Sequence, residues 1–169
     1  MNAEYWIQKL ELQKHPEGGY YRETYRSNDI IKKDGLSSRA IEQRNSSTAI
    51  YYLLSEKDFS AFHRLKSDEI FHFYHGAPLQ VHILTSSGEY KSVLLGDTQG
   101  ENPTFQLVIN QGDWFASEVS QPNSYSLIGC TVSPGFDFSD FELASADELI
   151  NQYPNYEEII TRLTIEKEP

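Results

Sequence analysis

The sequence predicts a mainly β domain, either a sandwich or a barrel, with short helices at its two ends. Between residues 48 and 132 the chain carries about eight short apolar segments separated by turn residues, at the spacing of about 8–12 residues that is typical of such folds. On both sides of this region, apolar residues recur three and four positions apart, which indicates helices. A chain of 169 residues can bury a core without disulfides, so we expect one domain over residues 1–169.

The N-terminal part of the chain is predicted to form a helix that is followed by helix-breaking residues. Ala3–Leu12 carries apolar residues at helical spacing, and residues 14–19 then contain one proline and two glycines, which end a helix. The polar stretch Ser27–Asn45 is rich in turn residues and is predicted to be a surface loop.

Eight strands are predicted in the middle of the chain, each of them short and bounded by Gly, Pro, Asn, Asp or Ser. Their ranges are Thr48–Leu54, Ser60–Leu65, Glu69–His75, Leu79–Leu84, Tyr90–Leu95, Thr104–Asn110, Trp114–Val119 and Tyr125–Val132. After them, Ser145 and Glu148 have the spacing of a capping box, and Pro154 begins a second helical segment. We expect the barrel over about residues 15–143 and the C-terminal helices over about residues 145–165.

The charged residues are unevenly distributed along the chain. Twenty-five acidic and 14 basic residues give a net charge of −11. Residues 1–91 hold 12 residues of each sign, whereas residues 92–161 hold 11 acidic residues and neither Lys nor Arg. Nucleic-acid binding needs clustered basic side chains, and an acidic membrane surface repels a polyanionic protein. The charge pattern therefore argues against nucleic-acid polymers and membranes as partners.

The sequence also bears on the cellular compartment. No apolar run approaches the roughly 18 residues that a membrane-spanning helix requires, and the N-terminus lacks the basic and apolar regions of a secretory signal. The single cysteine, Cys130, allows no internal disulfide and suits a reducing compartment. It lies in an apolar strand, where a thiol usually serves as a small core residue. We expect a cytoplasmic protein.

The segment from His63 to Gly76 is the most informative one for function. His63 falls on one predicted strand, and Glu69 opens the next. Strand alternation places Glu69, Phe71 and Phe73 on one face, so His63 and Glu69 approach each other among aromatic rings if this face points into a barrel. An imidazole and a carboxylate in an apolar cavity can serve as metal ligands, as an acid–base pair or as a hydrogen-bonding site.

The spacing of these residues resembles the first motif of the cupin superfamily, H-x-H-x(3,4)-E-x(6)-G. His63, Glu69 and Gly76 match this motif, and Leu65 stands at the position of its second histidine. Further blocks narrow the resemblance to one small cupin-like family, and they cover most of the chain. These blocks are residues 15–20, 48–54, 62–69, 129–138 and 141–143. The resemblance implies a double-stranded β-helix, a jelly-roll barrel that is usually paired as a homodimer.

The second cupin motif is degenerate in this chain. Residues 111–113 are similar to its start, but Asn123 falls at its histidine position, and no histidine follows His82. Cupin metal sites typically combine three histidines and one carboxylate, of which the resemblance supplies only His63 and Glu69. Catalytic zinc sites use three protein ligands. We therefore expect no metal cofactor and keep a divalent metal on His63 and Glu69 as the alternative.

The resemblance implies no particular reaction, because the members of this small family have no assigned activity and the fold also occurs in epimerases, oxygenases, isomerases and storage globulins. We expect a small organic ligand: a carbohydrate, a nucleotide-like molecule or an organic acid. If the protein is an enzyme, we expect an epimerase or isomerase with His63 as the base and Tyr52, or Tyr51, as the acid. Three alternatives stay open: a metal-dependent enzyme, a storage or structural dimer, and a merely structural pairing of His63 with Glu69.

Further ligand contacts are expected from Tyr51, Phe71, Phe73 and Arg22. If residues 20–26 form a strand, Arg22 and Arg26 share one face, and two guanidinium groups beside an aromatic cavity would suit a carboxylate or phosphate. Ion pairing of these arginines with Glu17 or Glu23, or across a dimer interface, is an equally strong interpretation.

Overall fold

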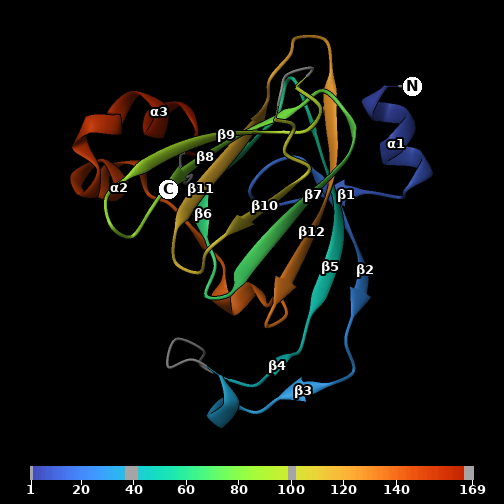
Figure 1. Cartoon of the computed structure of the whole chain (residues 1–169), viewed down its shortest axis with the longest axis vertical. Helices are drawn as coiled ribbons and strands as arrows, with labels where there is room; N and C mark the ends of the chain where they lie inside the picture. The colour runs from blue at the N-terminus through green and yellow to red at the C-terminus, as the bar shows by residue number, and fades with distance from the viewer. Residues whose placement is uncertain (1, 37–41, 99–101, 166–169) are drawn as a thin grey trace.

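The computed structural model describes residues 2–36, 42–98 and 102–165, which form two antiparallel sheets with helices at either end of the chain (Figure 1). The larger sheet has the strand order β1 (Gln13–Lys14), β2 (Tyr20–Arg26), β5 (Thr48–Ser55), β12 (Tyr125–Ser133), β7 (Asp68–Gly76) and β10 (Gln106–Ile109). The smaller sheet has the order β13 (Glu142–Leu143), β6 (Phe59–Arg64), β11 (Trp114–Val119), β8 (Leu79–Leu84) and β9 (Tyr90–Leu95). The predicted mainly β fold, a double-stranded β-helix with helical ends, is confirmed.

The core lies between the two sheets. Alternate residues of each strand point inward, as the pleat requires, and the resulting cluster draws side chains from both sheets. Its buried members are Tyr52, Leu54, Phe71, Leu79, Val81, Ile83, Leu95, Ile109, Phe115, Ile128 and Cys130. The interior is therefore apolar and aromatic through most of its length.

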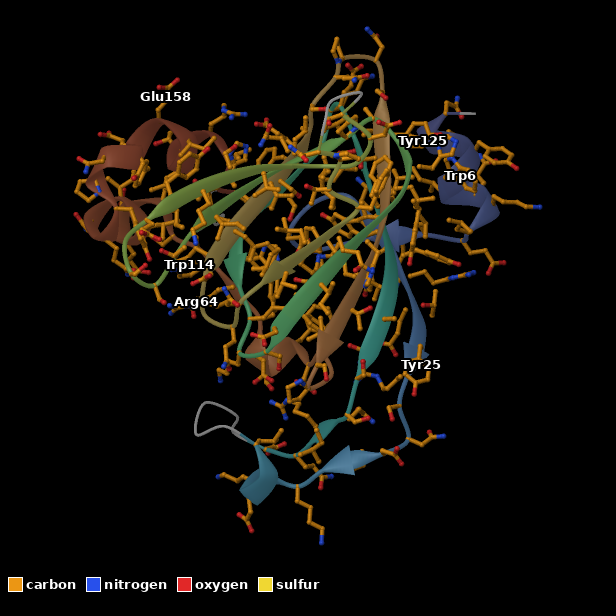
Figure 2. The ribbon with its side chains drawn as sticks, viewed as in Figure 1. Trp6, Tyr25, Arg64, Trp114, Tyr125 and Glu158 are labelled. Carbon is orange, nitrogen blue, oxygen red and sulfur yellow. The ribbon has the colours of Figure 1, made fainter. Side chains whose placement is uncertain are left out.

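The helices cover the outside of this barrel. Helix α1 (Ala3–Lys9) packs on the outer side of the larger sheet, where the indole Nε1 of Trp6 donates to the Tyr125 hydroxyl at 2.8 Å (Figure 2). Helices α2 (Ala146–Gln152) and α3 (Glu157–Arg162) cover the outer side of the smaller sheet (Figure 1). No helix in the described part of the chain combines the length and the apolarity needed to cross a membrane.

All eight predicted strands are present, but several predicted local features differ. The first helix ends at Lys9 rather than Leu12, because Glu11 adopts a left-handed conformation (φ +53°) that a helix cannot continue through. The predicted strand at 104–110 shortens to Gln106–Ile109. Ser145 is the N-cap of α2 as expected, but its side chain makes no capping hydrogen bond.

The polar stretch Ser27–Asn45 is more ordered than a plain surface loop. It contains the short ribbon of β3 (Ile30–Ile31) and β4 (Arg44–Asn45), and the 3₁₀ turn η1 (Lys33–Gly35). Figure 1 shows that this ribbon extends beyond the ends of β2 and β5, away from the helices. Residues 37–41 of the predicted loop lie outside the described residues. The two other 3₁₀ turns are η2 (Phe138–Asp140) and η3 (Pro154–Tyr156).

Candidate functional site

A cavity of about 250 Å³ opens into the barrel interior beside the first residues of β5 and β7 and the last residues of β12. The strands present their inward side chains to it, and the segment that follows β12 forms its outer wall. Its lining residues are Gln13, His15, Glu17, Tyr21, Glu23, Arg26, Thr48, Ile50, Tyr52, His63, Leu65, Glu69, Phe71, Cys130, Val132, Phe136, Asp137, Phe138 and Phe141. Of the predicted site residues, the structure brings together His63, Tyr52, Glu69 and Phe71 around this space.

The carboxyl partner of His63 is Glu17, not Glu69. The His63 Nε2 atom lies 3.0 Å from Oε2 of Glu17, and both side chains are buried. Glu17 Oε1 accepts a hydrogen bond from the Ser60 hydroxyl at 2.9 Å. One residue of β6 holds both members of the pair: the Ala61 N–H donates to the Glu17 backbone carbonyl at 2.8 Å, and the Ala61 carbonyl lies 2.7 Å from His63 Nδ1.

This geometry fixes where the protons of the pair lie. A carbonyl oxygen only accepts, so His63 Nδ1 carries a proton and donates it to Ala61. Nε2 and Glu17 Oε2 then share one further proton. Burial lowers the pKa of His63 to about 4 and raises the pKa of Glu17, so both shifts favour a neutral imidazole that accepts from a protonated carboxyl. Both shifts therefore bias the pair toward its uncharged form.

Glu69 is a second buried acidic side chain. It lies on β7 of the larger sheet, whereas His63 lies on β6 of the smaller sheet. Burial, followed by the proximity of Glu17, raises the pKa of Glu69 to about 8, and a hydrogen bond with Cys130 opposes this shift. Burial also raises the pKa of Cys130 well above its ordinary value, so the thiol stays protonated and is a poor nucleophile. Cys130 is therefore a core residue, as predicted, and it also forms a weak hydrogen bond with the carboxyl group of Glu69.

Tyr52 is buried beside the His63–Glu17 pair, but its hydroxyl proton is used in a hydrogen bond within the protein. Its hydroxyl donates to the Gly18 carbonyl at 2.7 Å and lies close to the Glu17 carboxyl. Burial and the nearby Glu17 raise the pKa of Tyr52 well above its ordinary value. In this geometry Tyr52 holds the loop that carries Glu17.

Aromatic rings form much of the cavity wall. The Phe115 ring centroid lies 4.0 Å from that of His63, and the Phe141 centroid lies 5.4 Å from it. The His15 side chain is buried, lies 3.4 Å from Glu17 through its Nδ1, and stacks against Phe138 with a centroid distance of 6.2 Å. Burial lowers the pKa of His15, which keeps this ring neutral as well.

The outer wall is anchored by a buried ion pair. Arg44 binds Asp140 through two hydrogen bonds of 2.6 and 2.8 Å, and it donates a third, of 2.8 Å, to the Ser139 hydroxyl. Asp140 and Ser139 belong to η2, which also carries Phe138 and is followed by Phe141. The ion pair therefore fixes the aromatic residues that close the cavity.

The structure corrects the predicted placement of Arg22 and Arg26. A β-bulge between Glu23 and Tyr25 adds one residue to β2 and reverses its alternation. Arg26 therefore lies on the cavity side, beside Thr48, whereas Arg22 lies outside, where it pairs with Glu11 at 3.1 Å. The two arginines do not share a face.

Tyr51 and Phe73 also lie outside this cavity. Tyr51 alternates with the inward Ile50 and Tyr52, so it faces outward, 5.9 Å from the Arg22 guanidinium. Phe73 points inward but sits farther along β7, where it packs near Phe105 at the other end of the barrel. Placing both residues at the site was wrong, because alternation alone gives neither the inward face nor the depth.

Glu17 is the functional residue that sequence reasoning missed. A readable signal was the Gly18-Gly19 pair after it, because two adjacent glycines indicate close approach of the backbone to another segment. Gly18 has a φ of +112°, and a Cβ there would lie 2.0 Å from the Phe59 carbonyl oxygen. Only a residue without a side chain lets this loop press against β6 and bring Glu17 to His63.

The side chains at this site do not fit a cupin metal centre. Leu65 lines the cavity at the position of the second motif histidine, and Asn123 lies in the turn before β12, bound through its N–H to Glu56 and away from the cavity. His63 uses both ring nitrogens in the contacts described above. Within residues 2–36, 42–98 and 102–165, no group of three or more His, Cys, Asp and Glu side chains has the geometry to hold a metal ion.

Comparison with known proteins agrees with this architecture. The family described as the cupin superfamily (DUF985) matches residues 4–144. The chain is 32% identical over 153 residues to the uncharacterized protein YML079W of Saccharomyces cerevisiae, covering 85% of this chain and 76% of that protein.

Two solved structures are also similar. A hypothetical protein from Leishmania major has 34% identity and a TM-score of 0.88, covering 98% of this chain and all of that one. Protein SO0799 from Shewanella oneidensis has 35% identity and the same TM-score, with 99% of each chain covered. The chain therefore belongs to the cupin superfamily, in the family described as DUF985.

Proposed function

We propose that this protein binds a small polar organic molecule in the cavity and catalyses a proton transfer of the epimerase or isomerase type on it, without a metal. The observation that carries the proposal is the buried His63–Glu17 pair, which holds one shared proton at the cavity. A cavity of about 250 Å³ is smaller than the ~300–1,000 Å³ typical of drug-sized ligands, so it suits a molecule about the size of a single sugar ring.

The pair can act as acid and base in one step. Glu17 donates its proton to a carbonyl oxygen of the ligand while His63 Nε2 accepts a proton from the adjacent carbon. The C–H electron pair becomes the new C=C bond, and the C=O π pair becomes the new O–H bond, so a ketone is converted to its enol. Return of a proton to the other face, or to the neighbouring carbon, completes an epimerisation or an isomerisation.

The two groups depend on each other in this step. Burial makes His63 a weak base on its own, with a pKa of about 4. When Glu17 loses its proton, however, its carboxylate lies 3.0 Å from the imidazolium that forms and stabilises it. Transfer of the proton from Nε2 to Oε2 then restores the uncharged pair.

Glu17→Gln is expected to abolish proton transfer while leaving ligand binding largely intact. A thermal-shift screen of sugars, small amines, nucleotides and organic acids identifies ligands, because a molecule that binds the folded state raises its melting temperature. NMR in D₂O then measures deuterium uptake at the ligand carbon. We expect the exchange rate to fall at least ~100-fold in Glu17→Gln and in His63→Ala.

Arg22→Ala is the matched control, because Arg22 lies outside the cavity and its loss should change neither binding nor exchange. If a ligand binds but its carbon takes up no deuterium, the protein binds the ligand without catalysing proton transfer. This outcome would contradict the proposed reaction. If no ligand raises the melting temperature, the proposal fails and the storage or structural reading replaces it.

We also propose a homodimer formed through the outer face of the larger sheet. This face exposes Tyr25, Tyr74 and Val108, which are 54, 52 and 53% accessible (Tyr25 in Figure 2). Exposed apolar and aromatic side chains on one face of a sheet can take part in an interface between subunits. We expect sedimentation velocity to show a dimer and the Tyr74→Glu/Val108→Glu variant to be monomeric. A monomeric wild-type protein, or a variant that stays dimeric, contradicts this assignment.

A further inference from the structure

Acidic side chains outnumber Lys and Arg side chains around the cavity. Four carboxyl side chains line it, from Glu17, Glu23, Glu69 and Asp137, and Arg26 is the only Lys or Arg among the described lining residues. An anionic ligand would therefore depend on Arg26 for its recognition.

Arg26 has little capacity left for a ligand. Its Nε and Nη2 atoms donate to the two carboxylate oxygens of Glu23 at 3.0 and 2.7 Å. Its Nη1 atom donates to Asn45 Oδ1 at 2.9 Å and to the Phe136 carbonyl at 3.1 Å. Four of the five guanidinium N–H groups are thus engaged, and Glu23 compensates the charge. Arg26 builds the wall of the cavity and leaves no free cation for an anion.

Glu69, unlike Arg26, has no strong hydrogen-bond donor or cation as partner among the described residues. Its carboxyl is buried, with 7% of the residue exposed, and its hydrogen-bond partner is the Cys130 thiol, which is a weak donor. In the part of the chain that the structure describes, no Lys or Arg forms an ion pair with it. Buried carboxyl groups normally have a strong donor or a cation as partner. Glu69 lines the cavity, so a ligand is the group that can supply one.

The apolar part of the wall favours the same kind of ligand. Six phenyl and phenol rings line the cavity, from Tyr21, Tyr52, Phe71, Phe136, Phe138 and Phe141. The face of an aromatic ring carries partial negative charge and attracts ammonium groups. Rings and carboxyl groups together make an environment that stabilises a cation and destabilises an anion.

We propose that the ligand of this cavity is a small organic cation, and that the carboxyl group of Glu69 accepts an N–H bond from its ammonium group. This inference rests on the proposed function in one respect, namely that the cavity binds a small molecule. It narrows the ligand class to amine-bearing molecules and removes nucleotides and organic acids.

A series of ring compounds that share one size and differ in charge tests the inference. Cyclohexylamine, which is protonated at pH 7, is compared with cyclohexanol and cyclohexanecarboxylate by calorimetry or ligand-observed NMR. We expect the ammonium to bind about tenfold or more tightly than the alcohol, and the carboxylate to bind more weakly than both. Equal affinities, tighter binding of the carboxylate, or no binding of the ammonium would overturn the proposal.

Glu69→Gln tests the residue assigned to the contact. This variant keeps the shape of the side chain, and we expect the preference for ammonium over alcohol to shrink to about twofold or less. Glu11→Gln, which alters an exposed carboxyl outside the cavity, should keep the full preference. If Glu69→Gln does not fold, the ¹³C shift of the Glu69 carboxyl in wild-type protein replaces it, and this shift should respond to the ammonium alone.

The two proposals fail in different ways. If the ligand screen finds a neutral or anionic molecule whose deuterium exchange requires Glu17, the proposed reaction stands and the inference about charge is wrong. If cyclohexylamine binds through Glu69 but no ligand shows exchange, the inference about charge stands and the proposed reaction is wrong.

Discussion

Asp140→Ala is expected to lower the free energy of unfolding by about 3–5 kcal/mol, because it leaves Arg44 buried without its partner. The side chains of Arg44 and Asp140 are each only 5% exposed, and two short hydrogen bonds join them. Removing one member of such a pair leaves an uncompensated charge in a largely buried position. Urea denaturation followed by tryptophan fluorescence measures the change, provided that the m-value stays constant.

The matched control is Glu142→Ala. Glu142 also forms a two-point contact with an arginine, Arg64, but these side chains are 54 and 38% exposed. Exposed pairs contribute about 0–1 kcal/mol, so this variant should be nearly as stable as the wild type. If both variants lose the same amount, the burial of the Arg44–Asp140 pair is not what matters.

Asp140→Ala should also weaken ligand binding at temperatures where the variant is fully folded. The ion pair fixes η2, and η2 places Phe138 and Phe141 against His15 and His63. Loss of this anchor frees the outer wall of the cavity. Unchanged affinity in a folded Asp140→Ala protein would show that the wall is held by other contacts.

Between pH 4.5 and 8, the free energy of unfolding of Glu69→Gln relative to the wild type is expected to rise by about 5 kcal/mol. The pKa of Glu69 is about 8 in the folded protein, against an ordinary value of 4.5. Between these values the folded state binds the proton more tightly than the unfolded state, so stability is lost as pH rises from 4.5 to 8, at about 1.4 kcal/mol per unit. Glutamine does not titrate, so the stability of the variant relative to the wild type should increase across this window.

His63 contributes with the opposite sign. Its pKa falls from 6.5 to about 4 on folding, so stability is lost as pH falls from 6.5 toward 4. Both proteins contain His63, and its contribution largely cancels in their difference. Chemical denaturation at pH 4.5, 6.5 and 8 measures this difference. Parallel pH profiles of the two proteins would mean that Glu69 ionises normally in the folded state.

The strands could be predicted because their apolar runs and turn residues are local properties of the sequence. Leu79–Leu84, Tyr90–Leu95 and Trp114–Val119 match the predicted ranges at both ends. His63 and Glu69 could be placed at the site by alternation within two strands that are consecutive along the chain. These inferences need only the pleat of a strand and one turn.

The rest of the site depends on contacts between distant segments. Glu17 reaches His63 because a loop presses against β6 at Gly18, and the sequence marks this loop only as the end of a helix. Arg22 and Arg26 lie on opposite faces because of a bulge, and one added residue leaves no trace in the hydrophobic pattern. Local patterns specify the strands, whereas these inserted residues and close approaches decide which side chains meet.

The backbone of Ala61 ties the proposed proton donor and the proposed proton acceptor to one residue of β6. Its N–H holds the backbone of Glu17 and its carbonyl holds the ring of His63, so a fluctuation of β6 carries both groups together. The distance across which the proton moves is therefore set during folding and does not wait for a ligand. A centre built in this way needs little reorganisation when charge develops, which is the condition under which buried dipoles lower a reaction barrier most effectively.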